Sequence, residues 1–348
     1  KNIMSNKQLD WANLGFGYVQ TEKRYVSNYK DGAWGEGELT EDANVVISEC
    51  AGVLQYAQTC FEGLKAYRTE DGHIVTFRPD LNAKRMADSA RRLQMPVFPE
   101  DKFVEAVAQV VKANEAYVPP YGSGATLYLR PYMFGNDPHL GVHAVHEAVF
   151  VVICSPVGAY YAEGINPVKI AIESQDVRAV RGGTGYAKCG GNYAASMTAT
   201  VESHDMGYSN VFYLDPKEKR YIDECGAANF FAIKGNAYLT PRSRSILPSI
   251  TNKTLEEVAA HLGMEVERRP VPVEELSTFE EVGECGTAVV ITPVHKLVDK
   301  PFLESDEETV YLYGDGQCGP KSLRLYNFIT QLQKGDIEDP FGWVHFVE

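Results

Sequence analysis

The most unusual segment of this 348-residue chain is 181–196, in which one lysine, Lys188, lies among five glycines. Small neighbours let a planar ligand approach the backbone and remove water from the amine. Because desolvation disfavours an ammonium ion, we expect the pKa of Lys188 to fall below its ordinary value of about 10.4. A neutral amine attacks a carbonyl carbon and forms a Schiff base. The alternative interpretation is a surface lysine on a flexible glycine loop.

A lysine that forms a Schiff base is typical of enzymes that use pyridoxal phosphate, a cofactor that also needs a carboxylate for its ring nitrogen and a site for its phosphate. Glu224, at an expected strand–loop junction, is the candidate carboxylate. The segment 247–257 leads into an expected helix start, where backbone N–H groups and the helix dipole attract phosphate. Thr251 adds a hydroxyl there, and Arg85 adds a positive charge. Helix capping for Thr251 and solvent exposure for Arg85 and Glu224 are the open alternatives.

Six segments together resemble the branched-chain amino-acid aminotransferases, which belong to the fold-type IV class of pyridoxal phosphate enzymes. They are FEGLKAY (61–67), YLRP (128–131), 181–196, ECGAANFF (224–231), LPSIT (247–251) and GTAVVITPV (286–294). The resemblance implies an α/β (mixed α+β) fold of two domains with the active site between them. It implies ping-pong transfer of an amino group between L-leucine, L-isoleucine or L-valine and 2-oxoglutarate, in branched-chain amino acid biosynthesis or breakdown.

The resemblance also implies cofactor roles for individual residues. Lys188 matches the Schiff-base lysine that shuttles a proton, Glu224 the carboxylate at the pyridine nitrogen, and Tyr193 a tyrosine near the cofactor's 3′ oxygen. The positions that match phosphate-binding residues are Arg85, Ile250, Thr251 and Thr287.

Substrate roles follow from the same resemblance. Thr287 and Ala288 match the main-chain N–H groups that hold the α-carboxylate, and Tyr128 and Arg130 match a pair lining the same site. The apolar wall for the branched side chain is matched by Tyr56, Phe61 and Tyr160. Val142 matches a residue that the family contributes from the neighbouring subunit, so the resemblance implies a homodimer.

Composition limits the other functions that the chain could have. Lys and Arg number 33 and Asp and Glu number 47, so the net charge is −14, which opposes binding to nucleic acid and to anionic membranes. The longest apolar run, 148–154, is far shorter than the ~20 residues of a membrane span. The seven cysteines include no CxxC pair, and the first residues include no apolar signal segment. We therefore expect free thiols and a cytoplasmic protein.

Hydrophobic periodicity predicts mixed helices and strands in both halves. Helices are expected at 81–93, capped by Asp80, and at 102–117, capped by Asp101. Further helices are expected at 194–207 and at 254–263, the latter with a Thr254–Glu257 capping box. The expected strands are 126–135, 147–161, 168–174, 210–215, 229–234 and 286–294. A break rich in Gly and Pro suggests a smaller N-terminal α/β domain (1–158), an interdomain loop (159–168) and a larger cofactor-binding domain (169–348).

Other functions remain open. A D-amino-acid aminotransferase or an aminodeoxychorismate lyase of the same fold would share the surroundings of Lys188 and Glu224. A metal-dependent hydrolase using His139, His143 and His146 is the alternative from another class, although their spacing matches neither common zinc motif. A non-catalytic amino-acid-binding module would require that Lys188 never form an imine. With the aminotransferase interpretation we expect no metal in the active site.

Overall fold

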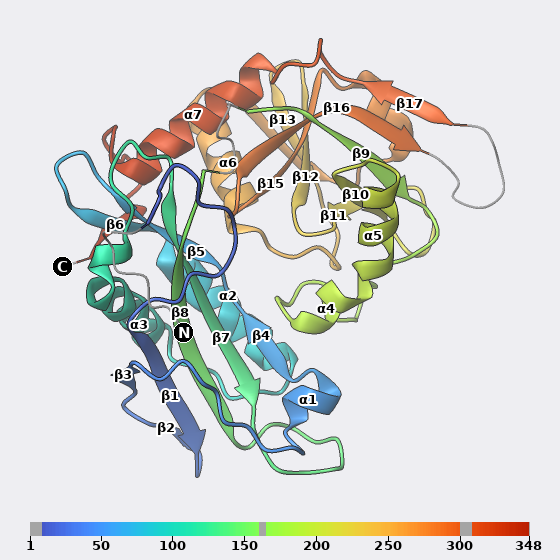
Figure 1. The fold of residues 1–348 in the computed structure, drawn as a ribbon. Helices are drawn as coiled ribbons and strands as arrows, with labels where there is room; N and C mark the ends of the chain where they lie inside the picture. The colour runs from blue at the N-terminus through green and yellow to red at the C-terminus, as the bar shows by residue number, and fades with distance from the viewer. Residues whose placement is uncertain (1–8, 160–164, 300–307, 348) are drawn as a thin grey trace. The chain divides into compact units, whose positions relative to one another are not determined.

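The computed structural model describes residues 9–159, 165–299 and 308–347. These residues divide into two compact units, each built on a sheet (Figure 1). The first unit takes the described residues of 1–162, 187–190 and 331–348, and the second takes those of 163–186 and 191–330. Two segments that the sequence analysis assigns to the C-terminal domain, 187–190 and 331–348, therefore lie in the first unit.

The sheet of the first unit is antiparallel throughout the described residues. Its order is β18-β6-β5-β7-β8-β1-β2, with β3 paired to β1 and β4 paired to β7. The strands are β1 (Arg24–Lys30), β2 (Ala33–Trp34), β3 (Glu38–Thr40), β4 (Thr59–Phe61), β5 (Leu64–Arg68), β6 (Ile74–Phe77), β7 (Thr126–Gly135), β8 (Ala148–Val157) and β18 (Val344–Phe346). The strands predicted at 126–135 and 147–161 are confirmed as β7 and β8.

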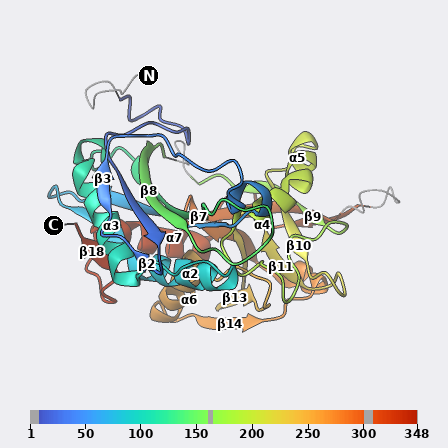
Figure 2. The same cartoon turned by 90° about the horizontal axis from the view of Figure 1, so that it is seen from below.

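Helices cover one face of this sheet (Figure 2). They are α2 (Pro79–Arg92), α3 (Glu100–Ala113) and the 3-10 turn η2 (Glu115–Tyr117), whereas α1 (Gly52–Tyr56) packs its Val53 against the apolar cluster of the other face. Side chains alternate along β8, so Phe150 and Val152 face the core that also holds Met86 of α2 and Phe103 of α3. Val149 and Val151 belong to a smaller apolar cluster instead. The core thus fixes α2, which carries one of the predicted site residues.

The predicted caps of α2 and α3 are wrong, although both helices exist. Helix α2 begins at Pro79, whose fixed φ suits a first helical residue, so Asp80 lies inside the first turn. Helix α3 begins at Glu100, directly after Pro99 at the N-cap position, and Asp101 lies inside its first turn. A carboxylate in the first turn favours the helix through the dipole rather than by capping.

The sheet of the second unit contains both parallel and antiparallel pairs. Its order is β11-β10-β9-β16-β15-β12-β13-β14, with β17 paired to β16. The strands are β9 (Val168–Glu173), β10 (Asn210–Leu214), β11 (Ile222–Cys225), β12 (Asn229–Lys234), β13 (Ala237–Pro241), β14 (Glu265–Arg269), β15 (Glu281–Gly286), β16 (Val290–Asp299) and β17 (Thr309–Leu312). The other elements are α4 (Gly190–Ala195), α5 (Met197–Asp205), α6 (Ile250–His261), η3 (Val273–Thr278) and α7 (Pro320–Lys334), the last of which the sequence analysis missed.

Two local predictions in this unit need correction. The segment 286–294 is not one strand, because a turn at 287–289 separates β15 from β16. Helix α6 begins before Thr254, so this residue is not a cap, and its hydroxyl donates to the carbonyl of Ile250 (2.8 Å). The end of the helix is as predicted, since Gly263 follows it with φ of +80°, a left-handed conformation that favours glycine.

Two broader predictions concern the cysteines and membrane-spanning segments. All seven cysteines are free thiols. None of the described helices is both long enough and apolar enough to cross a membrane.

Glu284 on β15 is a buried carboxyl group whose charge is poorly compensated. Burial raises its pKa to about 7, against hydrogen bonds from Asn210 and Cys225 that lower it. The Asn210 amide donates to the carboxylate at 2.7 Å. Because the folded state binds this proton more tightly than the unfolded state does, the contribution of Glu284 to stability falls as pH rises from about 4.5 to about 7.

We therefore expect Glu284→Gln to be more stable than the parent protein by about 2–3 kcal/mol at pH 8 and nearly equal to it at pH 4.5. Glutamine keeps the shape and the acceptor for Asn210 but carries no charge. Urea unfolding at the two pH values measures the difference. A Glu267→Gln variant, on the partly exposed strand β14, is the control and should change stability little at either pH. A gain that is independent of pH would contradict the argument.

Candidate active site

The backbone of Lys188 is fixed to the first sheet. The Phe61 N–H of β4 donates to the Lys188 carbonyl (3.0 Å), and an isolated bridge pairs Cys60 with Cys189. On the other side, the Lys188 N–H donates to the hydroxyl of Ser89 in α2 (2.9 Å). The glycine-rich segment is therefore not a free loop at this position, and the lysine side chain has a defined origin.

The Lys188 amine lies in surroundings that favour its neutral form. Burial, with a smaller contribution from the nearby Arg85, lowers its pKa to about 8, whereas Glu62 opposes the shift. Its Nζ lies 4.8 Å from the centre of the Phe61 ring. The desolvated amine expected from the sequence is thus present, and a substantial fraction of it is unprotonated under mildly alkaline conditions.

Arg85 forms a buried ion pair that the sequence analysis did not foresee. Its Nε and Nη2 reach the two carboxylate oxygens of Glu62 at 2.7 and 2.8 Å. The Asn82 amide donates to the same carboxylate (2.7 Å), and Glu62 is fully buried. Because two planar groups meet in parallel, this contact fixes the orientation of the guanidinium beside Lys188. Arg85 is therefore not on a solvent-exposed helix face.

Tyr128 and Arg130 of β7 lie together, as the resemblance implies. The Arg130 Nη2 donates to the Tyr128 hydroxyl (3.0 Å), and the guanidinium carbon lies 4.8 Å from the centre of the Phe61 ring. Glycine is needed at Gly63, because a Cβ there would lie 2.2 Å from the Tyr128 hydroxyl. Among the described residues, the buried Nε of Arg130 has no hydrogen-bond partner. This guanidinium keeps a donor available for an anionic group.

Tyr56 and Val142 lie at a different place in the same unit. Tyr56 ends α1, and its hydroxyl donates to the carbonyl of Leu140 in the loop between β7 and β8. Val142 belongs to this loop and is 72 % exposed. Tyr160, the third expected wall residue, lies outside the described residues.

Glu224 of β11 is buried and is held by two partners within the second unit. Its Oε1 lies 2.7 Å from Nη2 of Arg178 and accepts the Leu247 N–H (3.1 Å). Arg178 is a site residue that the sequence analysis missed, and both its Nε and its Nη1 are buried without a partner among the described residues. Glu224 is therefore an oriented, charge-paired carboxylate, not a loop residue facing water.

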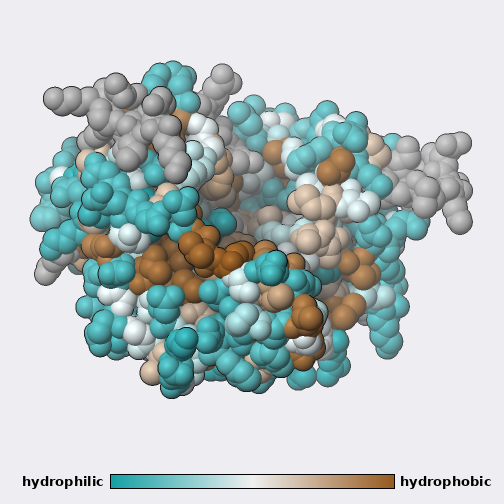
Figure 3. Space-filling view, turned by 60° about the horizontal axis from the view of Figure 1, so that its bottom comes forward, coloured by the Kyte–Doolittle hydropathy of each residue, from teal (hydrophilic) through white to brown (hydrophobic). Residues whose placement is uncertain are grey.

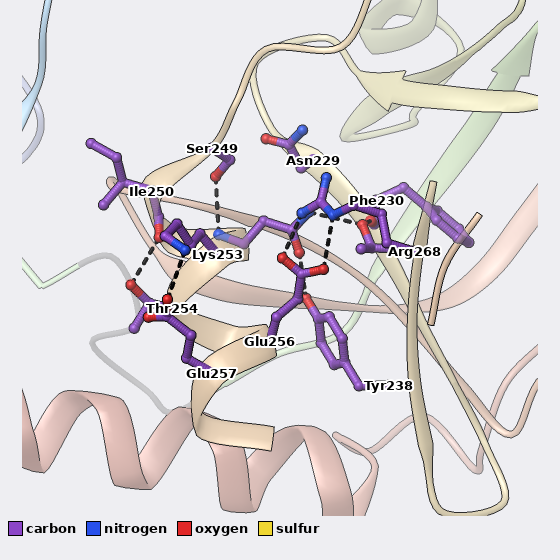
Figure 4. Close-up of polar contacts among 12 residues, drawn as sticks. Asn229, Phe230, Tyr238, Ser249, Ile250, Lys253, Thr254, Glu256, Glu257 and Arg268 are labelled. Carbon is purple, nitrogen blue, oxygen red and sulfur yellow. Dashed lines mark hydrogen bonds and ion pairs between the residues drawn. The ribbon is translucent and has the colours of Figure 1, made fainter. Parts of the chain in front are cut away.

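The segment that Glu224 holds through Leu247 leads into the N-terminus of α6. Figure 4 shows Ser249 and Ile250 at this helix start. Ser249 caps this helix, since its hydroxyl accepts the Asn252 N–H at 3.1 Å. Ile250 and Thr251 follow as the first two helical residues. Their N–H groups precede the first intrahelical bond and point away from the helix along its axis, which makes this end suited to a phosphate.

The turn at Thr287 and Ala288 lies near the loop that follows Glu224. A Cβ on Gly286, at the start of the turn, would lie 3.9 Å from the carbonyl oxygen of Ala227. Just after the turn, Val290 is buried and has φ of +67°. A β-branched residue in this region is strained, and such strain persists where the surrounding structure imposes a conformation. Tyr193, on α4, is half-buried.

The glycine-rich segment is held in place by contacts within the second unit. The Asn192 amide donates to the carbonyl of Thr184, and the Thr184 hydroxyl donates to Asn192, each at 2.8 Å. A Cβ on Gly185 would lie 2.2 Å from the carbonyl oxygen of Ser245. Glycine at 185 therefore serves a close backbone approach rather than flexibility.

The charged side chains around Lys188 in the first unit indicate which ligands can bind there. Arg85, Arg130 and Lys188 bring up to three positive charges to one carboxylate, Glu62. An excess of positive charge on buried and partly buried side chains attracts carboxylates and phosphates, although the chain as a whole is acidic.

Comparison with known proteins gives the family. The family model for amino-transferases of class IV matches residues 59–297, a span that contains Lys188 and Glu224. The chain belongs to the class IV aminotransferase family. It is 47% identical to the branched-chain-amino-acid aminotransferase of Haemophilus influenzae, over 98% of this chain and 100% of that protein. It is 43% identical to the branched-chain-amino-acid aminotransferase of Helicobacter pylori, over 97% of this chain and 98% of that protein.

Solved structures agree with these class IV relatives. The crystal structure of the Escherichia coli branched-chain amino acid aminotransferase matches with a TM-score of 0.78 at 27% identity, over 94% of this chain and 100% of that chain. The branched-chain amino acid aminotransferase from T.th., solved with pyridoxamine 5′-phosphate, matches with a TM-score of 0.75 at 26% identity, over 92% of this chain and 98% of that chain. The predicted α/β fold of fold-type IV is confirmed.

The three histidines considered above as ligands of a metal-dependent hydrolase do not all lie in one group. His139 and His143 lie together with Asp137, but His146 is not part of that group. Family membership does not support a metal-dependent hydrolase.

The sequence analysis did not name Glu62 or Arg178. Glu62 could have been noticed as an acidic residue inside FEGLKAY, whereas Arg178 belongs to no motif.

Proposed function

We propose that this chain is a pyridoxal phosphate-dependent branched-chain-amino-acid transaminase, which exchanges amino groups between L-leucine, L-isoleucine or L-valine and 2-oxoglutarate. Relatives that are 38–47% identical over nearly the whole chain bear the name branched-chain-amino-acid aminotransferase or transaminase. The observation that carries the proposal is the desolvated amine of Lys188, whose pKa the nearby guanidinium groups of Arg85 and Arg130 lower further. A nucleophilic amine with anion-binding neighbours is what the transfer of an amino group between two carboxylic acids requires.

The residues of each unit fit the cofactor. A similar structure contains pyridoxamine 5′-phosphate and another contains N-(5′-phosphopyridoxyl)-L-glutamate. Here the start of α6, with Ile250 and Thr251, offers N–H groups and a hydroxyl to a phosphate. Thr287 and Arg85 are the further phosphate-binding candidates. Arg178 fixes Glu224 as an oriented carboxylate for the protonated ring nitrogen, and Tyr193 is assigned to the 3′ oxygen.

The bound cofactor supplies a carbonyl carbon for the amine and a ring that withdraws electrons from the substrate. The chain's residues do the rest. Lys188, once released from the cofactor, takes the proton from the substrate Cα, and a pKa of about 8 suits this task near neutral pH. The N–H groups of Thr287 and Ala288 bind the α-carboxylate. Phe61 and Tyr56 bury the aliphatic side chain at ~25 cal/mol per Å².

Arg130 is proposed to select glutamate as the second substrate. Since its guanidinium stacks on Phe61 and has an unpartnered Nε, it can bind a side-chain carboxylate that leucine lacks. We expect Arg130→Ala to lower kcat/KM for glutamate by about 10- to 100-fold more than kcat/KM for leucine. Steady-state assays with both amino acids measure the ratio.

The control for this prediction is Arg68→Ala, which removes one positive charge from strand β5 and an exposed contact to Glu115. It should leave the ratio of the two kcat/KM values unchanged. Equal losses for glutamate and leucine in Arg130→Ala would argue against a role in selecting glutamate.

We also propose a cytoplasmic homodimer. The face of the first sheet opposite α2 carries the apolar cluster of Val149 and Val151, and nearby Val46 is 86 % exposed. Figure 3 shows hydrophobic side chains gathered in a band near the middle of one face. A second copy of the chain would cover such a surface, and Val142 would reach the partner from it. Sedimentation equilibrium tests this, and a monomer at micromolar concentration would refute it.

The decisive experiment for the proposed function is the visible absorption spectrum of the purified protein with pyridoxal phosphate, before and after addition of L-leucine. We expect a near-visible band that leucine removes and that 2-oxoglutarate restores. D-alanine should leave the band unchanged, which separates the proposal from a D-amino-acid aminotransferase. A protein that stays colourless with the cofactor, or a band that L-leucine does not change, would overturn the proposal.

A further inference from the structure

The loop between β7 and β8 contains a group of metal-binding side chains that the proposed reaction does not use. Asp137, His139 and His143 each offer one ligand atom, and these atoms all lie within 4.8 Å of one another. A tetrahedral zinc ion with Zn–N and Zn–O bonds of ~2.1 Å needs about 3.3 Å between its ligand atoms. The three side chains come from one loop and need to rotate to reach that spacing.

The hydrogen bonds of the two histidines leave the same nitrogen available on each ring. The Nδ1 of His139 contacts the carbonyl oxygen of Gly141, and the Nδ1 of His143 lies 2.6 Å from the carbonyl oxygen of Ala144. A carbonyl only accepts, so each Nδ1 carries the proton and each Nε2 has a free lone pair. Histidines that bind metals are oriented in this way, with the second ring nitrogen donating to a backbone carbonyl.

Two buried acceptor atoms at this place lack a partner among the described residues. They are Nε2 of His139 and Oε1 of Gln58. Both face the same glycine, since a Cβ on Gly52 would lie 1.8 Å from Gln58 Oε1 and 3.3 Å from His139 Nε2. Leaving a buried acceptor unpaired costs about 1–3 kcal/mol. A bound cation would satisfy the lone pairs of both atoms.

The carboxylate of the group is rigid. Asp137 is buried, and its two oxygens accept the N–H groups of His146 and Glu147 at 2.7 and 2.6 Å. These two hydrogen bonds join the two ends of the loop and fix the orientation of the Asp137 carboxylate. The His143 ring lies beside this carboxylate, with its Nδ1 at 3.9 Å, so the ring has to turn to direct Nε2 at a shared ion. The lone pairs that the N–H groups leave on the carboxylate remain for a metal ion.

We propose that Asp137, His139 and His143 form a binding site for a divalent transition-metal ion of the zinc type, with water or Gln58 Oε1 as the fourth ligand. Two imidazoles and one carboxylate are a donor set of nitrogen and oxygen that zinc prefers over magnesium or calcium. The site lies outside the residues assigned to amino transfer. The ion therefore positions the loop and takes no part in the reaction.

The metal site is linked to residues with a proposed role in substrate binding. The Tyr56 ring stacks on His139 with 6.2 Å between ring centres, and the Tyr56 hydroxyl donates to Leu140. Val142 lies between the two histidines in the sequence. A metal ion that holds both rings fixes Tyr56 and Val142 relative to each other. This link, unlike the metal site itself, rests on the proposed function.

Isothermal titration calorimetry of the holoenzyme with Zn²⁺ alone tests the site. We expect one ion per chain, and at least 10-fold weaker binding in both His139→Gln and His143→Gln. The matched control is His146→Gln, which removes an imidazole from the same loop but not from the group, and it should bind Zn²⁺ as the parent protein does. Circular dichroism verifies that each variant is folded. Absence of binding to the parent protein, or equal binding by all three variants, would overturn the site.

Kinetics test the link to the substrate. Saturating Zn²⁺ should change KM for leucine at least 3-fold in the parent protein and in His146→Gln, and should leave KM unchanged in His143→Gln. An unchanged KM in all three proteins would refute the link to Tyr56. Because the calorimetry does not depend on turnover, failure of the proposed transaminase activity would leave the binding result intact.

Discussion

Replacing Lys188 by alanine should lower the rate of amino transfer by at least about 1000-fold while the protein stays folded. The reason is that the variant loses both the nucleophile that holds the cofactor and the base that removes the Cα proton. The contacts that fix the backbone at this position, to Phe61 and Ser89, use main-chain atoms of residue 188 and survive the substitution. Single-turnover measurement with L-leucine and the cofactor supplied in excess gives the rate.

A second lysine makes a stringent control for this prediction. Lys65, on β5 in the same unit, also has its pKa lowered to about 8 by burial. It differs from Lys188 because the shift comes from burial alone, whereas Lys188 also interacts with Arg85, Glu62 and Arg130. We expect Lys65→Met, which keeps an unbranched apolar stem, to retain turnover within about 5-fold of the parent protein.

Reduction with borohydride separates the two lysines chemically. Peptide mass spectrometry should find the reduced cofactor on Lys188 in the parent protein and in Lys65→Met, and on neither lysine in Lys188→Ala. Label on Lys65 in the parent protein, or turnover retained by Lys188→Ala, would remove Lys188 from the proposed mechanism.

The elements that could be predicted from the sequence are those that a short stretch of residues specifies by itself. The strands β7, β8, β9, β10 and β12 were predicted because apolar runs bounded by turn residues identify buried strands without further information. The end of α6 was likewise predicted from Gly263, because the residue that follows a helix often has a positive φ, which glycine adopts without strain. The short strands of the first unit carry too few apolar residues to stand out.

The wrong predictions concern sequence patterns that are compatible with more than one local structure. Asp80 is a good capping residue, but the preceding Pro79 is a still better first helical residue, so the helix begins earlier. Thr254 followed by Glu257 matches a capping box, but Ser249 caps the helix first. In the segment 286–294 the turn at 287–289 has neither proline nor glycine, and hydrophobicity alone made it continuous with the strand.

The candidate site shows the same limit. The desolvation of Lys188 was predictable, yet the partners that decide its electrostatics were not, because Glu62 and Arg85 meet only through the packing of α2 on the first sheet. Arg178 reaches Glu224 from a part of the sequence with no motif of its own. Long-range ion pairs are set by the tertiary fold, and a single sequence gives no periodic signal for them.

The contact to Arg178 changes what we expect from Glu224→Gln. Glutamine keeps an oxygen that can accept from Arg178 and from the Leu247 N–H, so the local geometry is retained. The negative charge is lost, and a neutral amide cannot keep the cofactor's ring nitrogen protonated. We therefore expect turnover with leucine to fall by about 100-fold or more, with cofactor affinity reduced much less.

The same substitution removes the carboxylate that is paired directly with the buried Arg178, which should destabilise the protein by about 3 kcal/mol. Asp223 is the matched control, because it is the adjacent buried carboxyl on β11 and accepts a hydrogen bond from the Ser245 hydroxyl (2.8 Å). Burial raises the pKa of Asp223, so Asp223→Asn removes a poorly compensated charge and should lose neither turnover nor stability.

Thermal unfolding, cofactor titration and leucine turnover of both variants form one test of Glu224. The role at the ring nitrogen predicts that only Glu224→Gln loses turnover, and that it does so even when saturated with cofactor. If Glu224→Gln lost affinity for the cofactor but turned over normally once saturated, Glu224 would serve binding alone. Equal losses in Asp223→Asn would show that turnover depends on the packing of β11 rather than on the charge that Arg178 holds in place.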